Sequence, residues 1–289
     1  MQRIDAHQHF WQLARGGYGW LRADDPVVAP LVRDFLPEAL MPMLRTHDVT
    51  RTVLVQAADS VAETAFLLGL AAAHDVIAGV VGWVALDRDE AASTLERLAA
   101  DGRLKGVRPM LQDLPTDDWI LQAPRPEALR TLQRLGLRFD ALVRPRQLAA
   151  LARFARAWPD LPIVIDHAAK PPLAADWGDE AMQAWRRDMA TLAAAPQVCC
   201  KISGLLTELA PSDRASPARA TARVRPVIDA LLAWFGPERL MWGSDWPVLT
   251  LAGSYAEWVS VSDDLLGPLS AGERAQVLHG SAQRFYGLA

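Results

Sequence analysis

Two histidines, His7 and His9, stand one residue apart in the segment Arg3–Trp11. Side chains alternate across a β-strand with a period of two, so both imidazoles share one face if this segment is a strand. Two imidazoles on one face at a strand end can hold a metal ion or donate hydrogen bonds to a substrate oxygen. Taken alone, the same pattern also fits a strand that merely ends in polar residues.

Other polar side chains stand at the ends of apolar runs further along the chain. If these runs are parallel strands, their polar ends meet at one edge of the sheet, where barrel enzymes place their active sites. Carboxylates, imidazoles and cations gathered there could perform acid–base chemistry or bind a substrate. The set comprises Gln56, Arg108, Asp166, His167, Lys201 and Asp245.

The segments that must position these residues are short apolar runs alternating with helix-patterned segments. Eight such repeats in 289 residues predict one (β/α)8 barrel domain spanning residues 1–289. A doubly wound open sheet is the alternative, but no glycine-rich phosphate loop follows the first strand. We expect strands at Ile4–His7, Thr52–Ala57, Gly79–Ala85, Gly106–Pro109, Arg138–Val143, Ile163–His167, Val198–Ser203 and Leu240–Asp245, and helices at Val61–His74, Glu90–Ala100, Pro126–Leu135, Arg146–Ala157, Glu180–Ala194 and Arg223–Phe235.

Composition excludes several classes of protein. The formal net charge of -4 gives no reason to expect nucleic acid or an anionic membrane surface as a partner. No apolar run approaches the roughly 18 residues of a membrane span, and the N-terminus lacks a signal-peptide pattern. Cys199 and Cys200 are adjacent, so an ordinary disulfide between them is sterically poor. A cytoplasmic location is expected.

Six motifs spread along the chain resemble the amidohydrolase superfamily, and more narrowly its L-fuconolactonase-like and L-rhamnonolactonase-like branch of sugar-lactone hydrolases. The resemblance runs from Ile4 to the C-terminal "HGSAQRFYGL". It implies a distorted TIM barrel that hydrolyses a cyclic ester, with water activated by the aspartate of the last strand. The motifs are "IDAHQHFW", "VLVQAA", "KGVRPMLQD", "IDHAAKPP", "KISGL" and "LMWGSDWPV".

Lactone hydrolysis requires a base for water and donors where the carbonyl oxygen becomes anionic. The resemblance makes Asp245 the base, with a cap on the following loop as its alternative role. His167 is the second catalytic candidate. Arg108 could stabilise the oxyanion or bind substrate hydroxyls through its fixed fork of donors, or simply pair with a carboxylate. Gln56 and Lys170 are expected to contact the substrate, with a role at the surface as the alternative for Lys170.

Eleven tryptophans are many for this length. An indole face can pack against the C–H side of a sugar ring while polar groups bind its hydroxyls. Trp119 and Trp246 are expected to face the substrate, with core packing as the alternative. The long segment Phe10–Pro37 is predicted to be a lid over the barrel mouth, and Pro211–Arg219 an exposed loop.

The sequence departs from the superfamily's binuclear members, which use a carboxylated lysine on the fourth strand and histidines on the fifth and sixth. Here the fourth strand ends in Arg108, and the fifth, "RFDALVR", has no histidine. One divalent ion such as zinc could still be bound by His7, His9 and Asp245, with His167 as a further candidate. A metal-free mechanism, which the resembled branch makes credible, stays open.

Two aspartates near these histidines are expected to have supporting roles. Asp5 is in phase with His7 and His9 and is predicted to orient a histidine from outside. Asp166 is out of phase with His167 and is predicted to cap or pair structurally. Two other functions compete with the lactonase: a single-metal carboxy-lyase of the same superfamily, which should need a further histidine ligand, and a non-catalytic ligand-binding barrel, which should lack a base.

Overall fold

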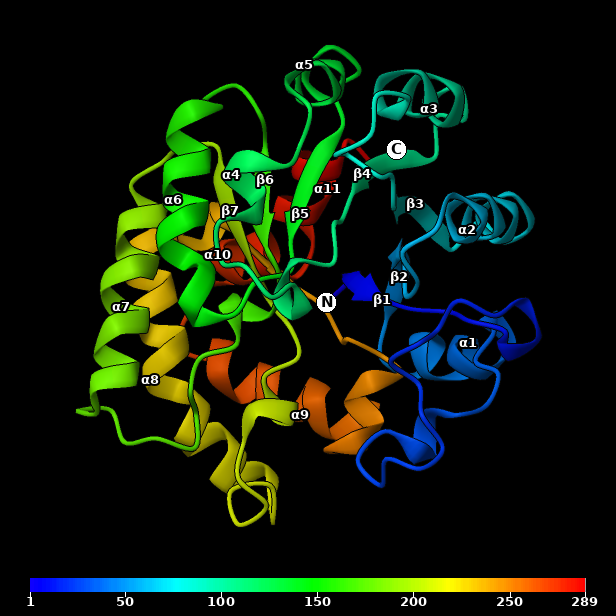
Figure 1. The fold of residues 1–289 in the computed structure, drawn as a ribbon. Helices are drawn as coiled ribbons and strands as arrows, with labels where there is room; N and C mark the ends of the chain where they lie inside the picture. Colours follow the sequence, from blue (N-terminus) through cyan, green and yellow to red (C-terminus); the bar gives the residue numbers. More distant parts are fainter. Residues whose placement is uncertain (289) are drawn as a thin grey trace.

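The computed structural model describes residues 1–288, so Ala289, the end of the predicted domain, lies outside the described residues. Eight parallel strands form one sheet in sequence order, with helices arranged around them (Figure 1). The strands are β1 (Arg3–Gln8), β2 (Val49–Val55), β3 (Ile77–Gly82), β4 (Leu104–Val107), β5 (Arg138–Ala141), β6 (Ile163–Ile165), β7 (Val198–Ile202) and β8 (Leu240–Trp242).

The last strand returns to the first. Beyond β8, the Asp245 N–H donates to the His7 carbonyl at 2.8 Å, and the His9 N–H donates to the Trp246 carbonyl at 2.7 Å. Gly243 permits this approach, because a Cβ there would lie 2.8 Å from the Cβ of His7. These bonds close the sheet into a (β/α)8 barrel, and the predicted fold class is confirmed.

The six predicted helices are present, and five of them match to within two residues at each end. The sixth, α8, begins earlier, because the Ser216 hydroxyl accepts from the Arg219 N–H and Pro217 suits a first turn. It therefore takes in the end of the predicted loop Pro211–Arg219. The helices are α1 (Pro37–Thr46), α2 (Val61–Ala73), α3 (Ala91–Ala99), α4 (Trp119–Gln122), α5 (Pro126–Arg134), α6 (Leu148–Ala157), α7 (Glu180–Ala193), α8 (Pro217–Phe235), α9 (Tyr255–Leu266), α10 (Ala271–Ala275) and α11 (Ser281–Tyr286).

Several strands end before the polar residues that the sequence placed inside them. Strand β6 ends at Ile165 and β8 at Trp242. His167 (φ 53°) and Asp245 (φ 60°) have left-handed backbone conformations, which are incompatible with a strand. The candidate site residues therefore lie on the turns that follow the strands.

The core has two parts, one between the strands and the surrounding helices and one inside the barrel. The inner part is apolar at the end where the strands begin, and α11 packs there with Phe285 and Tyr286. The other members of the inner part include Ile4, Ala6, Val53, Val55, Val81, Val164 and Met241. The polar residues lie at the opposite end of the barrel, where the strands finish.

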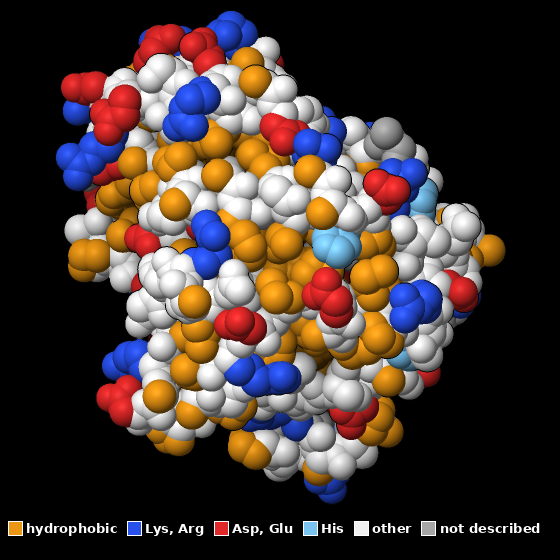
Figure 2. Space-filling view, turned by 90° about the vertical axis from the view of Figure 1, so that its right-hand side faces the viewer, with side chains coloured by type: hydrophobic (Ala, Val, Ile, Leu, Met, Phe, Trp, Pro, Cys, Tyr) orange, Lys and Arg blue, Asp and Glu red, His pale blue; other side chains and the backbone are white. Residues whose placement is uncertain are grey.

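On the face shown in Figure 2, basic and acidic side chains are interspersed, and hydrophobic side chains gather across the middle. None of the helices in residues 1–288 is both long and apolar enough to cross a membrane.

Candidate functional site

A cavity of ≈ 210 Å³ opens where the strands end. Its polar and apolar walls suit a small molecule with hydroxyl groups on an apolar frame. The polar lining comprises His9, Arg108, Gln112, Asp113, His167, Lys170 and Asp245, and the apolar lining Trp20, Val28, Ala57, Met110, Leu142, Val248 and Leu251.

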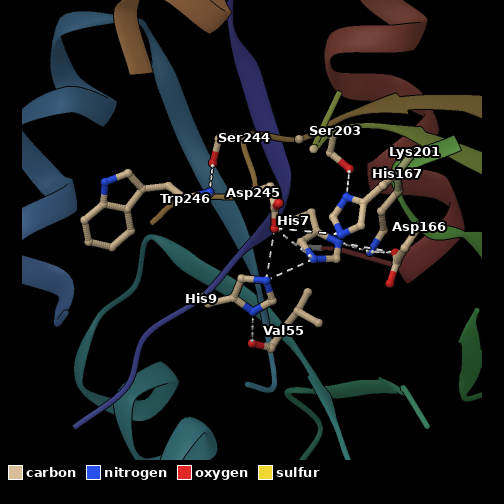
Figure 3. Close-up of polar contacts among 12 residues, drawn as sticks. His7, His9, Val55, Asp166, His167, Lys201, Ser203, Ser244, Asp245 and Trp246 are labelled. Atoms are coloured by element: carbon tan, nitrogen blue, oxygen red, sulfur yellow. Dashed lines mark hydrogen bonds and ion pairs between the residues drawn. The ribbon is translucent and has the colours of Figure 1, made fainter. Parts of the chain in front are cut away.

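His7, His9 and Asp245 converge at the cavity floor (Figure 3). The Nε2 atoms of the two imidazoles are 3.2 Å apart. The Oδ1 atom of Asp245 lies 3.2 Å from Nε2 of His9 and 3.7 Å from Nε2 of His7. The structure thus brings together the three residues that the sequence proposed as metal ligands.

Hydrogen-bonding rules show what this cluster requires. Nδ1 of His9 lies 2.8 Å from the Val55 carbonyl, which can only accept, so Nδ1 carries the proton. In the neutral ring, Nε2 of His9 then turns a lone pair toward the Asp245 carboxylate, which also only accepts. Two acceptors at this distance need a donated proton or a bound cation beside them. The donor set fits one divalent ion.

The predicted phase of Asp5 is wrong. The pairing of β1 with β2 shifts between Asp5 and Gln8, so His7 turns into the barrel while Asp5 turns outward. One carboxylate oxygen of Asp5 accepts from the backbone N–H groups of His7 (3.2 Å) and Ser244 (2.8 Å). The other accepts from the Tyr255 hydroxyl on α9 at 3.0 Å. Asp5 therefore fixes the backbone where β1 meets the end of β8 and does not contact an imidazole.

A fully buried charge network lies beneath His7. Nδ1 of His7 is 3.2 Å from Oδ1 of Asp166 and 3.1 Å from Nζ of Lys201. Lys201 also pairs with Asp166 at 3.0 Å and with Asp140 at 2.6 Å. The Tyr286 hydroxyl on α11 donates to Asp140 at 2.6 Å. Asp166 was expected to cap or pair structurally. It does pair, and its partners His7 and Lys201 lie at the centre of the site.

Asp140 and Tyr286 were missed by the sequence analysis. The signal for Asp140 was a charged residue within the apolar strand "RFDALVR". A carboxylate in such a strand is rarely buried without a partner, so Asp140 and the in-strand Lys201 could have been paired. Nothing in the sequence pointed to Tyr286.

The site holds neutral imidazoles beside an ionised carboxylate. Burial and the Lys201 charge lower the pKa of His7 well below its usual value. Burial also lowers the pKa of His167 to about 4, although Asp245 acts in the opposite direction. Burial acts to raise the pKa of Asp245, but the neighbouring His167 and His9 outweigh it and hold that pKa below its usual range.

A left-handed turn delivers His167 and Lys170 to the cavity. Residues 167–170 all have φ between 50° and 57°. Nδ1 of His167 lies 2.9 Å from the Ser203 hydroxyl, and Nε2 lies 3.8 Å from Asp245. Gly204 (φ +62°) makes room, because a Cβ there would lie 2.6 Å from Nδ1 of His167. Lys170 lines the cavity and pairs with Glu208 at 3.6 Å.

Gln56, which the sequence predicts to contact the substrate, holds Arg108 in place and is not among the residues within 1–288 that line the cavity. The Arg108 guanidinium donates to the backbone and side-chain oxygens of Gln56, and the Gln56 amide donates to the Arg108 carbonyl at 2.8 Å. Gln56 is fully buried because these bonds turn it toward the arginine. Arg108 itself lines the cavity, with NH1 3.3 Å from Nε2 of His7.

Neither tryptophan expected at the substrate lines the cavity in the described part of the chain. Trp246 is 3% exposed and packs edge-on against Phe10 and Phe35, with its indole directed away from the histidines (Figure 3). Trp119 begins α4 and borders a separate small hollow. An aromatic pocket buries the first indole, and the second lies on a short extra helix beside that hollow.

The segment Phe10–Pro37 does reach the cavity, with Trp20 and Val28 in its wall. It is anchored rather than loose: Trp11 and Phe35 exchange two backbone hydrogen bonds, and both are buried. The indole N–H of Trp20 donates to the Ala57 carbonyl at 2.8 Å, so the polar atom of this side chain is satisfied and its apolar ring is what the cavity wall contains. Trp20 is therefore the tryptophan that lines the cavity.

Acid–base groups at the ends of barrel strands, around a cavity the size of one small molecule, define an enzyme of the (β/α)8 class. Residues 4–288 match the family model described as Amidohydrolase, and the chain belongs to this family.

The chain is also similar to characterised relatives over nearly its whole length. It is 45% identical to an L-fucono-1,5-lactonase of Burkholderia ambifaria, covering 98% of this chain and 95% of the relative. It is 40% identical to an L-fucono-1,5-lactonase of Burkholderia multivorans, with 99% and 96% covered. An amidohydrolase structure from Burkholderia multivorans with bound zinc matches at 38% identity and a TM-score of 0.89, with both chains fully covered.

Proposed function

We propose that this protein hydrolyses L-fucono-1,5-lactone, or a close variant such as an L-rhamnonolactone, to the aldonic acid. The two lactonases at 45% and 40% identity support a lactone hydrolase, as the sequence predicts. The observation that carries the mechanism is the buried Asp245 carboxylate, which faces the cavity floor among three histidines. Such a carboxylate is placed to take a proton from water.

In the proposed reaction, water attacks the lactone carbonyl and Asp245 accepts its proton. The carbonyl oxygen becomes anionic, and the charge of Arg108 stabilises it. The ring C–O bond then breaks, and the released alkoxide takes up the proton. If the Ser203 hydroxyl donates to Nδ1 of His167, Nε2–H of His167 is left as a neutral donor toward the cavity. Lys170 is positioned to bind substrate hydroxyls.

A divalent ion, when bound, would be held by His7, His9 and Asp245, and it would supply Lewis acidity and lower the pKa of water. Zinc is the proposed ion, since a relative binds it. The chain's own cations, Arg108 and Lys201, already lie against this cluster.

The first prediction concerns the substrate. A panel of aldonolactones, assayed by acid release with a pH indicator, should show turnover of L-fuconolactone and L-rhamnonolactone ahead of simple lactones, because the cavity combines polar groups with an apolar wall. Simple amides and phosphotriesters serve as controls and should not be hydrolysed. Turnover of these controls, with no activity on any sugar lactone, would refute the proposal.

The second prediction concerns the metal. We expect at most one divalent ion per chain by elemental analysis, since the cluster offers one ligand atom from each of three residues. Appreciable activity should survive dialysis against a chelator, because Arg108 can stabilise the oxyanion unaided. Two tightly bound ions per chain, together with a complete loss of activity that added metal restores, would contradict this.

We further propose a cytoplasmic enzyme of carbohydrate metabolism that acts on a small molecule, without nucleic acid or membrane partners. The free thiols of Cys199 and Cys200 suit a reducing compartment. The net charge of -4 supports the absence of an anionic partner.

A further inference from the structure

Both ring nitrogens of His7 are in contact with cations of the chain itself. Nζ of Lys201 lies 3.1 Å from Nδ1, and NH1 of Arg108 lies 3.3 Å from Nε2. Nε2 is also the atom that His7 contributes to the cluster with His9 and Asp245. When Nδ1–H of His7 donates to Asp166, an Arg108 N–H and a metal ion require the same lone pair on Nε2.

Arg108 does not occupy this place by chance. Its Nη2 atom donates to the backbone and side-chain oxygens of Gln56. Its Nη1 atom lies 3.5 Å from Oδ2 of Asp166. The side chain is buried, and Gln56 is fully buried behind it. A guanidinium held on two sides cannot leave His7 without breaking these contacts, which costs free energy.

The charge of the buried network leads to the same conclusion. Its ionisable members are the carboxylates Asp140, Asp166 and Asp245 and the cations Lys201 and Arg108, all nearly or fully buried. With neutral imidazoles, these groups carry one net negative charge. A divalent ion would leave one net positive charge in a buried site, which is unfavourable. Without Arg108, the same ion would balance the network.

We propose that Arg108 sets the metal affinity of the site by competing with a divalent ion for the Nε2 lone pair of His7. The role is additional to its contact with the substrate. The identity of residue 108 then determines how tightly the cluster binds a metal ion, although Arg108 is not itself a ligand.

The test measures metal binding and needs no substrate, so it is independent of the proposed lactonase activity. Metal-free protein is titrated with Zn²⁺ in competition with a chromophoric chelator. Arg108→Met keeps the length of the side chain and removes its charge. We expect Arg108→Met to bind Zn²⁺ about 10- to 100-fold more tightly than the wild type, the usual size of effects from residues beside a metal ligand. Unfolded protein could also bind Zn²⁺ through the exposed thiols of Cys199 and Cys200, so the comparison is made on protein shown to be folded by circular dichroism.

Two controls locate the effect. Arg144→Met removes an exposed guanidinium that pairs with Asp113 of the cavity lining at 3.5 Å, and it should leave the Zn²⁺ affinity unchanged. Adding His9→Ala to Arg108→Met should abolish the gain, because the new affinity must reside in the cluster. Unchanged or weaker Zn²⁺ binding in folded Arg108→Met, or a gain that survives the loss of His9, would overturn the proposal.

A second variant covers the case in which Arg108→Met does not fold. Gln56→Leu leaves the guanidinium in the chain but removes the side-chain half of its anchorage. It should show a smaller gain in Zn²⁺ affinity, of at least a few-fold. No gain in folded Gln56→Leu, when Arg108→Met cannot be prepared, would also overturn the proposal.

Discussion

Asp245→Asn is expected to lower kcat on the best sugar lactone by about 10²- to 10⁴-fold, the usual contribution of a general base. Asn keeps the size of the side chain but cannot accept the proton of water. The carboxylate makes no hydrogen bond to a backbone N–H among residues 1–288, and its polar contacts are with His7, His9 and His167. This favours a base over the alternative role as a cap. The variant should therefore stay folded, as judged by chemical denaturation.

The matched control is Asp264→Asn, which changes an exposed carboxylate on α9 and should leave kcat unchanged. The pH profile gives a second check. Because the pKa of Asp245 is held below its usual range, wild-type kcat should show no titration of this base above about pH 5. A variant with near wild-type turnover would place the base elsewhere, with His167 the next candidate, and a variant that unfolds would restore a structural role.

Much of the fold could be predicted from the alternation of apolar runs and helical segments. The helix starts that were missed depend on local capping. The start of α8 is set by Ser216, and α9, a helix that was not predicted, begins after Ser254, whose side chain caps it together with Glu257. The strand ends were placed too late, because the left-handed conformations of His167 and Asp245 have no signature in a sequence without glycine at those positions.

The site was predictable where spacing within one segment carried the signal. His7, His9 and Asp245 follow from a strand pattern and a motif at the end of a strand. The phase of Asp5 was missed because a bulge in β1 breaks the period of two.

Contacts between elements that are distant in the sequence were harder to predict. Trp246 and Trp119 were expected at the substrate and do not line the cavity in residues 1–288, because the sequence cannot tell an aromatic residue that is buried by partners from one that faces a cavity. Residues supplied by the far end of the chain, such as Tyr286, meet the site only because α11 packs against the barrel.

Lys201 should be the residue whose replacement costs the most stability. It is fully buried and lies 2.6 Å from Asp140 and 3.0 Å from Asp166, both of which are also fully buried. Removing one member of such a group leaves uncompensated buried charge. We expect Lys201→Met to lower the free energy of unfolding by about 3–5 kcal/mol, measured by chemical denaturation at pH 7.5.

The control is Lys105→Met, which removes a partly exposed lysine on β4 and should change the free energy of unfolding by about 0.5 kcal/mol or less. Adding Asp140→Asn to Lys201→Met should recover part of the loss, because one of the two unpaired carboxylates is then neutral. A Lys201→Met protein as stable as the wild type would show that the carboxylates find other partners.

The loss of stability in Lys201→Met should also depend on pH, and the direction of this dependence identifies its cause. Burial already raises the pKa of Asp140, and Lys201 opposes that rise. Without Lys201, the pKa in the folded state lies further above the unfolded value, so the folded protein favours the protonated acid. Stability is then retained at low pH and is lost as pH rises through the raised pKa. The difference between Lys201→Met and the wild type should therefore be smaller at pH 5 than at pH 7.5, whereas a simple packing defect would give the same difference at both.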